Sequence, residues 1–247
     1  MIESKLLHHR ESKEILPVNP TFFICSGTSG AGLTTALKEI VSTGLVNEPP
    51  AQFVTRQLRP NETRGEQYFP VNDEILSRIP QQIVLEATLY GNRYGFFKPA
   101  IEKLKKTLQK KNIIIDSVNT KKEWVNTLGD YSVISIFFAP KNPLVSLSRM
   151  LQRARDTGAV ITKGEVATRV SDSANSVSEI NGFDYWVDTT HFDSIIPDLT
   201  SIITYHSFGS DQKPSAIKVA DSEEVIAQFI KAYNIDLTDH ISTIFQR

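Results

Sequence analysis

Hydrophobic residues in this chain follow two alternating patterns. Short continuous apolar runs, typical of strands buried on both faces of a parallel sheet, occur at 22–25, 113–115 and 133–139. Between them, apolar residues recur at helical spacing over about 34–43, 99–108 and 144–151. Because strands that alternate with helices build parallel sheets, the pattern predicts an α/β fold.

The first apolar run leads into a glycine-rich turn and a helix start. The phosphate-loop pattern asks for Gly, four residues, Gly, Lys, then Ser or Thr, and the chain has Gly27, four residues, Gly32, Leu33 and Thr34. Backbone N–H groups in such a loop, with the dipole of the next helix, can surround a phosphate. The predicted nucleotide-binding residues are Gly27, Ser29, Gly30, Gly32, Leu33, Thr34 and Thr35. Leu33 removes the lysine charge, and similar glycine-rich turns also occur without ligands.

A second informative stretch, 53–69, contains three arginines around a turn signal at Pro60-Asn61. Guanidinium groups grip oxyanions through forked, charge-assisted hydrogen bonds. The other interpretation is a solvated polar hairpin, in which exposed ion pairs contribute little. Its position after a phosphate loop favours the oxyanion site.

Together these stretches resemble the guanylate kinase family of P-loop nucleoside-monophosphate kinases. The family's Thr-Arg-x-x-Arg-x-Gly-Glu-x-x-Gly-x-x-Tyr signature is matched by Thr55, Arg56, Arg59, Glu62, Gly65 and Tyr68, with Asn61 replacing the first Gly. Its later Glu and Gly-Asn-x-Tyr-Gly pattern appears as Glu86 and 91–95, and its central strand ending in Asp appears as 113–116. The resemblance extends from about Thr21 to Asp188.

The resemblance implies roles for individual residues. The acceptor phosphate would be held by Arg56, Arg59, Tyr68 and Tyr94, and Glu86 would face the base. Asp116 would lie near the phosphates and, with the Thr34 hydroxyl, near the metal; the implied cofactors are Mg²⁺ and ATP as phosphoryl donor. Structural alternatives stay open: Glu86 as an edge-strand charge, Tyr94 as a packing residue, Asp116 as a helix N-cap.

The same resemblance implies a lid. A helix carrying Arg153 and Arg155 would lead into a mobile lid over about 155–165, with Arg169 on the next helix. The predicted catalytic residues are Arg153, Arg155, Arg169 and Asp116. Lys163 is a candidate for the charge missing at Leu33, although a solvated loop lysine is the simpler interpretation.

Several positions depart from the family's pattern. Gln52 and Phe96 stand where hydroxyl groups would read the base, and Val118 stands where a second acid is common. A buried polar edge without partners costs about 1–3 kcal/mol per group, so guanine specificity is expected to be relaxed or replaced. Phe96 could instead stack on the base.

The predicted fold is a P-loop three-layer α/β sandwich with a mostly parallel sheet, an inserted acceptor-binding lobe and the lid. An N-terminal arm covers 1–20, the guanylate kinase-like domain 21–205 with the lobe at about 50–98, and a C-terminal extension 206–247. The domain is expected to close with a helix over 195–205, interrupted by Pro197. The extension should pack back on the domain or contact a protein partner or second copy.

Composition limits the partners and the compartment that are expected for this protein. Of 247 residues, 40% are hydrophobic and 22% charged, and the net charge is −1, which argues against broad adhesion to nucleic acid or anionic membranes. A single cysteine, Cys25, fits a reducing compartment, and no apolar stretch has the length of a signal-peptide core or membrane span. A cytoplasmic location is expected.

Two functions from different classes remain at this point. The first is transfer of the ATP γ-phosphate to a nucleoside monophosphate, GMP or a related one, slow or altered in specificity. The second is a catalytically weakened module that binds a nucleotide or a phosphorylated or acidic protein partner; Leu33 favours this one, while Asp116 and the lid favour the enzyme. A bisphosphate-forming sugar kinase is a third option.

Overall fold

The computed structural model describes residues 16–58, 62–66, 68–89, 91–118, 120–158, 160–234 and 241–243. In its first half the elements are β1 (Thr21–Gly27), α1 (Leu33–Ser42), β2 (Gln52–Val54), β3 (Tyr68–Pro70), α2 (Asp73–Arg78), β4 (Ile83–Leu89), β5 (Asn92–Phe97), α3 (Lys98–Leu108) and β6 (Ile113–Asp116). The second half contains α4 (Lys121–Leu128), β7 (Ser132–Ala139), α5 (Pro143–Thr157), α6 (Lys163–Ser178), β8 (Tyr185–Asp188), α7 (Phe192–Phe208), β9 (Ile217–Lys218) and α8 (Glu223–Tyr233).

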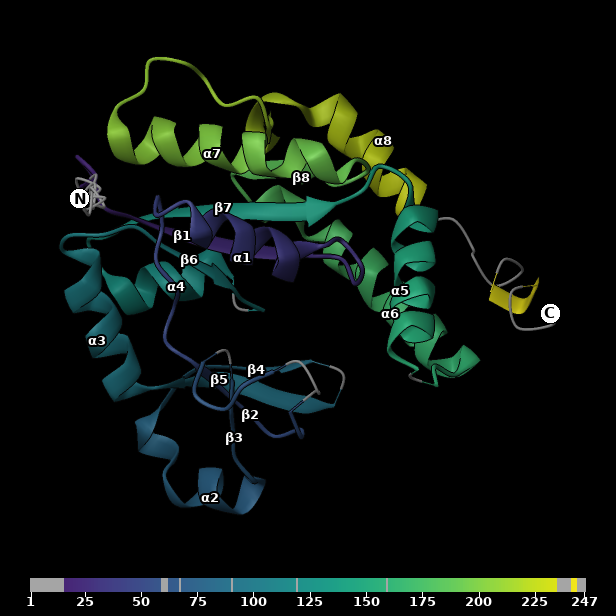
Figure 1. Cartoon of the computed structure of the whole chain (residues 1–247), viewed down its shortest axis with the longest axis horizontal. Helices are drawn as coiled ribbons and strands as arrows, with labels where there is room; N and C mark the ends of the chain where they lie inside the picture. Colours follow the sequence, from purple (N-terminus) through teal and green to yellow (C-terminus); the bar gives the residue numbers. More distant parts are fainter. Residues whose placement is uncertain are drawn as a thin grey trace, which may run out of the picture.

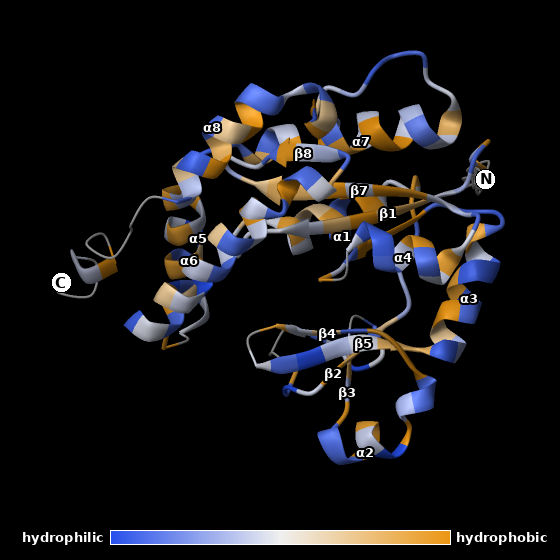
Figure 2. Cartoon of the chain, turned by 180° about the vertical axis from the view of Figure 1, so that it is seen from behind, coloured by the Kyte–Doolittle hydropathy of each residue, from blue (hydrophilic) through white to orange (hydrophobic). Residues whose placement is uncertain are grey.

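The main sheet has the strand order β6-β1-β7-β8-β9. Its first four strands are parallel, and β9 pairs antiparallel with β8. In β1, Phe23 and Cys25 pack toward α1 and α7, whereas Phe22 and Ile24 pack toward α3 and α4. Both faces are therefore covered, which explains why β1 and β7 are mostly apolar (Figure 2). The predicted three-layer α/β fold is confirmed.

A separate four-stranded sheet, ordered β3-β2-β5-β4, lies with α2 in a lobe below the main sheet (Figure 1). Phe53, Val71 and Leu76 form its own small core. Phe96, at the end of this sheet, is fully buried instead in the core under α3 and α4, 5.3 Å from the Trp124 ring. The suggestion that Phe96 stacks on a bound base is therefore wrong, since its ring has no exposed surface.

The predicted interruption of the last domain helix at Pro197 is also wrong, because α7 runs through it from Phe192 to Phe208. Pro197 removes one backbone donor and crowds the carbonyl of Asp193, but that carbonyl lies in the first turn, where the chain has room to adjust. Burial of the apolar face of α7 against the sheet offsets the local cost; its buried members include Ile195, Leu199, Ile202 and Ile203.

Helices α5 and α6 cover the two ends of the segment predicted as a lid, since α5 ends at Thr157 and α6 begins at Lys163. Beyond α7, α8 packs back on the same chain: Phe229 stacks on Trp186 at 4.0 Å between ring centroids. In the part of the chain that the structure describes, no helix has the length and apolar character needed to cross a membrane.

Candidate functional site

The glycine-rich turn between β1 and α1 forms a tight loop at the carboxyl end of the sheet. Gly30 has φ +84°, and a β-carbon there would lie 2.5 Å from the Ser146 carbonyl oxygen on α5. The Ala31 N–H donates to the Thr28 carbonyl at 3.0 Å and closes the turn. The first N–H groups of α1 have no acceptor within the helix, so they remain available to an anion.

Leu33 is the first residue of α1, and its side chain packs against the core between α1 and α7. The next residue, Thr34, is exposed. The loop itself therefore carries backbone donors and a hydroxyl but no cation.

Arg169 of α6 brings a positive charge to this loop. Its guanidinium donates to the Ser29 hydroxyl at 3.4 Å and is held by Glu165 at 2.7 Å. One turn further along α6, the Ser173 hydroxyl accepts from the Ser29 N–H at 3.3 Å. Helix α6 thus contacts the phosphate loop directly.

The other predicted lid cations lie elsewhere. Arg153 and Arg155 are exposed on α5, and among the described residues no hydrogen bond or ion pair joins either one to the phosphate loop. The Lys163 ammonium donates to the Ser242 hydroxyl at 2.9 Å, away from Ser29. Of the cations predicted for the lid, Arg169 is the one that contacts the loop within the described residues.

Asp116 ends β6 opposite Cys25 of β1, next to the phosphate loop in the sheet. Removal of its carboxyl from water raises its pKa from 3.8 to about 6. Its backbone carbonyl accepts from the Gln52 side-chain amide at 2.7 Å, so Gln52 ties the small lobe to the main sheet. The Asp116 carboxylate and the Thr34 hydroxyl are oxygen groups of the kind Mg²⁺ prefers.

Arg56 is the centre of a polar cluster on the small lobe. Its guanidinium forms a forked ion pair with Glu62 at 2.6 and 2.8 Å, and its Nε donates to the Tyr94 hydroxyl at 3.3 Å. The same guanidinium lies 4.9 Å from the centre of the Tyr68 ring. The hydrogen bond to Glu62 is the main reason that the pKa of Arg56 is raised, so this group keeps its charge.

Tyr68 lies close to the main sheet, because it pairs in the small sheet with Gln52, which bonds to Asp116. Burial, and secondly the charge of Asp116, raise the pKa of Tyr68 to about 12, so its hydroxyl remains a donor at neutral pH. The structure therefore brings Arg56, Tyr68 and Tyr94 together on the side of the lobe that faces Asp116. Arg59, predicted to join them, lies outside the described residues.

Glu86 is not part of this cluster. It forms an ion pair with Arg93 on the neighbouring strand, and Arg93 also pairs with Asp73 at the start of α2, at 2.9 Å. The register of β4 and β5 shifts between Val84 and Ala87, and Leu85 in that bulge has φ +52°. In this structure the Glu86 carboxylate is therefore held by an ion pair within the lobe.

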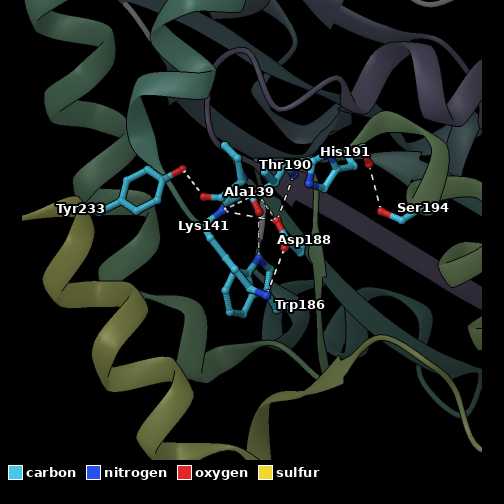
Figure 3. A network of polar contacts seen from close by, with 9 residues as sticks. Ala139, Lys141, Trp186, Asp188, Thr190, His191, Ser194 and Tyr233 are labelled. Atoms are coloured by element: carbon cyan, nitrogen blue, oxygen red, sulfur yellow. Dashed lines mark hydrogen bonds and ion pairs between the residues drawn. The ribbon is translucent and has the colours of Figure 1, made fainter.

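A second polar network fixes the carboxyl ends of β7 and β8 (Figure 3). The Asp188 carboxylate accepts from the Thr190 hydroxyl at 2.6 Å and pairs with the Lys141 ammonium at 3.3 Å. The Trp186 ring N–H donates to the Ala139 carbonyl at 2.9 Å. This network therefore stabilises the carboxyl end of the sheet, where the phosphate loop also lies. In open α/β sheets, ligands bind outside this end.

Glu62 and Ser173 take part in the site without a role predicted from the sequence, in which Glu62 stands only as a member of the family signature. The pairing of Glu62 with Arg56 had a local signal, since both lie in one short polar loop and forked pairs need opposite charges. Ser173 gave no such signal because it meets Ser29 only through tertiary packing.

These features define a P-loop protein with two candidate phosphate sites, one at the start of α1 and one on a separate small lobe. The guanylate kinase family model matches residues 19–206. This chain belongs to the guanylate kinase family, whose members are nucleoside-monophosphate kinases.

Individual relatives agree with this assignment. The guanylate kinase of Escherichia coli K12 is 29% identical over 187 residues, which covers 74% of this chain and 86% of that protein. The guanylate kinase of Hydrogenovibrio crunogenus is 28% identical over 184 residues with the same coverage. The crystal structure of guanylate kinase from Anaplasma phagocytophilum has the same fold, with a TM-score of 0.56 and 16% identity over 90% of this chain and 99% of that one.

Proposed function

We propose that this protein transfers the γ-phosphoryl group of ATP to a nucleoside monophosphate, GMP or a related acceptor, and that it does so slowly. The observation that carries the proposal is the cluster of Arg56, Tyr68 and Tyr94, which presents one fixed cation and two hydroxyl donors on the side of the lobe facing Asp116. Such a set complements the oxygens of a phosphate monoester.

Each surface has a separate task in this proposal. The Arg56 guanidinium and the two tyrosine hydroxyls bind the acceptor phosphate, while Glu62 holds Arg56 in its orientation. Backbone N–H groups at Gly32 and Thr34 bind the donor phosphates, with Arg169 as the nearby cation. Catalysis then rests on positioning and on neutralising charge, without a covalent intermediate on the protein.

The residues present fit a magnesium nucleotide. The Thr34 hydroxyl and the ionised Asp116 carboxylate would hold the ion, which supplies charge neutralisation at the phosphates. Within the described residues no three His, Cys, Asp or Glu side chains gather as a metal site, so most ligands would be phosphate oxygens and water.

Leu33 is the reason to expect a low rate. A positioned cation at the transferring phosphoryl group, such as an arginine finger, is worth about 10³–10⁵ in kcat. Arg169 offers a charge from α6, but its contact with the loop, at 3.4 Å to the Ser29 hydroxyl, is long.

A binding module without turnover is the second candidate. Leu33 favours it, because phosphate binding by backbone N–H groups needs no lysine whereas rapid transfer does. In this case the same Arg56 cluster would bind a nucleotide, or a phosphorylated or acidic protein partner.

Turnover of purified protein with ATP, Mg²⁺ and a panel of monophosphates tests the proposal. We expect slow ADP formation with one acceptor, and a loss of about 100-fold or more in kcat/KM on Arg56→Ala, because the positive charge that contacts the acceptor phosphate is removed. Arg78→Ala is the matched control, since Arg78 is exposed on α2 of the same lobe.

A Leu33→Lys variant separates the two candidates. If the unmodified chain forms no ADP with any acceptor and Leu33→Lys does, the kinase is rejected and the binding module is favoured. Turnover by the unmodified chain that Arg56→Ala leaves intact would reject the acceptor site.

A further inference from the structure

The chain continues beyond the segment that matches the family model, which ends at residue 206. In this continuation α8 crosses from β8 to the start of α5 (Figure 1). The described residues Ile241–Thr243 then lie against α5 and α6. We call α8 with these three residues the C-terminal brace.

Tyr233, the last residue of α8, joins the brace to the phosphate-loop end of the sheet. Its hydroxyl donates to the Pro140 carbonyl at 2.9 Å, beside the network of Asp188 and Lys141 (Figure 3). Its ring is 4% exposed and, with Ser146 and Ser173, lines a void of about 10 Å³. The ring thus fills the space where α5, α6 and the phosphate loop meet.

Ile241 joins the brace to the middle of α5 and the first turn of α6. It is 4% exposed and packs in one cluster with Leu147 and Met150 of α5 and Val166 of α6. Next to it, the Ser242 hydroxyl accepts from the Lys163 ammonium at the first residue of α6. The brace therefore contacts α6 at its start and along its inner face.

Both helices in turn contact the phosphate loop. The Ser146 hydroxyl on α5 lies 3.3 Å from the Thr28 hydroxyl. On α6, Ser173 and Arg169 both bind Ser29. Because Leu33 leaves the loop without a cation of its own, the charge next to its phosphates depends on α6 staying in this place.

We propose that the C-terminal brace holds α5 and α6 against the phosphate loop before nucleotide binds, and that Tyr233 and Ile241 are positioning residues that act on the nucleotide through Arg169. Their effect on nucleotide binding rests on the proposed function, whereas their effect on α6 does not.

Hydrogen exchange of the full chain without nucleotide tests the structural step. Ile241→Ala and Tyr233→Ala should speed amide exchange over 163–178 by about tenfold or more while exchange in β7 stays unchanged, because local opening is released without global unfolding. Val225→Ala is the matched control, since Val225 is 44% exposed on the outer side of α8. Unchanged exchange over 163–178 in both variants would overturn the proposal.

A double-mutant cycle tests the step through Arg169. Titration with a non-hydrolysable ATP analogue and Mg²⁺ should show an affinity about 3- to 10-fold weaker in Ile241→Ala, and no further weakening when Ile241→Ala is added to Arg169→Ala, as expected for residues that act as one unit. Equal weakening with and without Arg169 would show a merely structural role and overturn the proposal.

These readouts are distinct from turnover. Nucleotide binding and exchange that follow the expected pattern in a protein that forms no ADP would reject the kinase and leave the brace standing. If turnover is normal and amide exchange in α6 is unchanged in both Ile241→Ala and Tyr233→Ala, only the proposal about the brace is rejected.

Discussion

Replacing Asp116 by asparagine is expected to remove a pH dependence of folding stability. The Asp116 carboxyl lies at the end of β6, where removal from water raises its pKa from 3.8 to about 6. The folded protein therefore binds this proton more tightly than the unfolded chain does. Stability must then fall as pH rises through the window from about 4 to 6, because ionisation is easier in the unfolded chain.

The magnitude follows from the two pKa values. The full difference corresponds to about 3 kcal/mol of unfolding free energy, at 1.36 kcal/mol for each pH unit. Asp116 keeps some contact with solvent, which reduces the desolvation, so we expect a fall of about 1–3 kcal/mol. Asparagine has no proton to lose and nearly the same size, so the variant lacks this fall and is more stable than the unmodified protein above pH 6.

Urea unfolding followed by circular dichroism between about pH 4 and pH 7 measures the effect as a difference between the two proteins. Other titrating groups cancel in that difference. Asp211→Asn, at an exposed position after α7, controls for the loss of one carboxylate. Parallel pH curves for Asp116→Asn and the unmodified protein would refute the argument from burial.

Three further predictions concern the contacts around the site. Glu62→Gln should weaken acceptor binding about tenfold, because it removes the carboxylate that orients the Arg56 guanidinium, and a titration with the acceptor measures it. Gly30→Ala should cost about 2–3 kcal/mol in urea unfolding, since φ +84° is strained for alanine and its β-carbon meets the Ser146 carbonyl. Phe229→Ala should cost about 3–4 kcal/mol in the same assay because a buried stacked ring is lost, and a cost below 1 kcal/mol would mean that α8 is not integral to the fold.

The main sheet could be predicted from sequence because its signals are local. β1 is apolar at every residue from Phe22 to Cys25, and this follows from cover on both faces. The glycine turn after β1 could be predicted equally well, since Gly30 needs a positive φ that few other residues adopt.

The small lobe could be predicted from the sequence only in part. The pairing of Arg56 with Tyr94 agrees with the grouping expected from the motif, because Arg56 lies just after β2 and Tyr94 lies in β5, which pairs with β2. The position of Glu86 was not readable, because it depends on a register shift in β4 and on Arg93. Phe96 carried no signal of burial, since the Trp124 ring that covers it comes from a helix later in the chain.

The supply of charge to the phosphate loop shows why the rest required a structure. A lysine at position 33 would be visible as part of a local motif, because it would lie on the same turn as the glycines. Here the cation in contact with the loop is Arg169, which reaches Ser29 from α6 through packing of α6 on the loop. That packing includes Tyr233 and Ile241 from beyond the family segment. Since a charge held by tertiary contacts is lost whenever those contacts open, phosphate affinity in this protein should vary with the stability of α6, as it would not with a lysine in the loop.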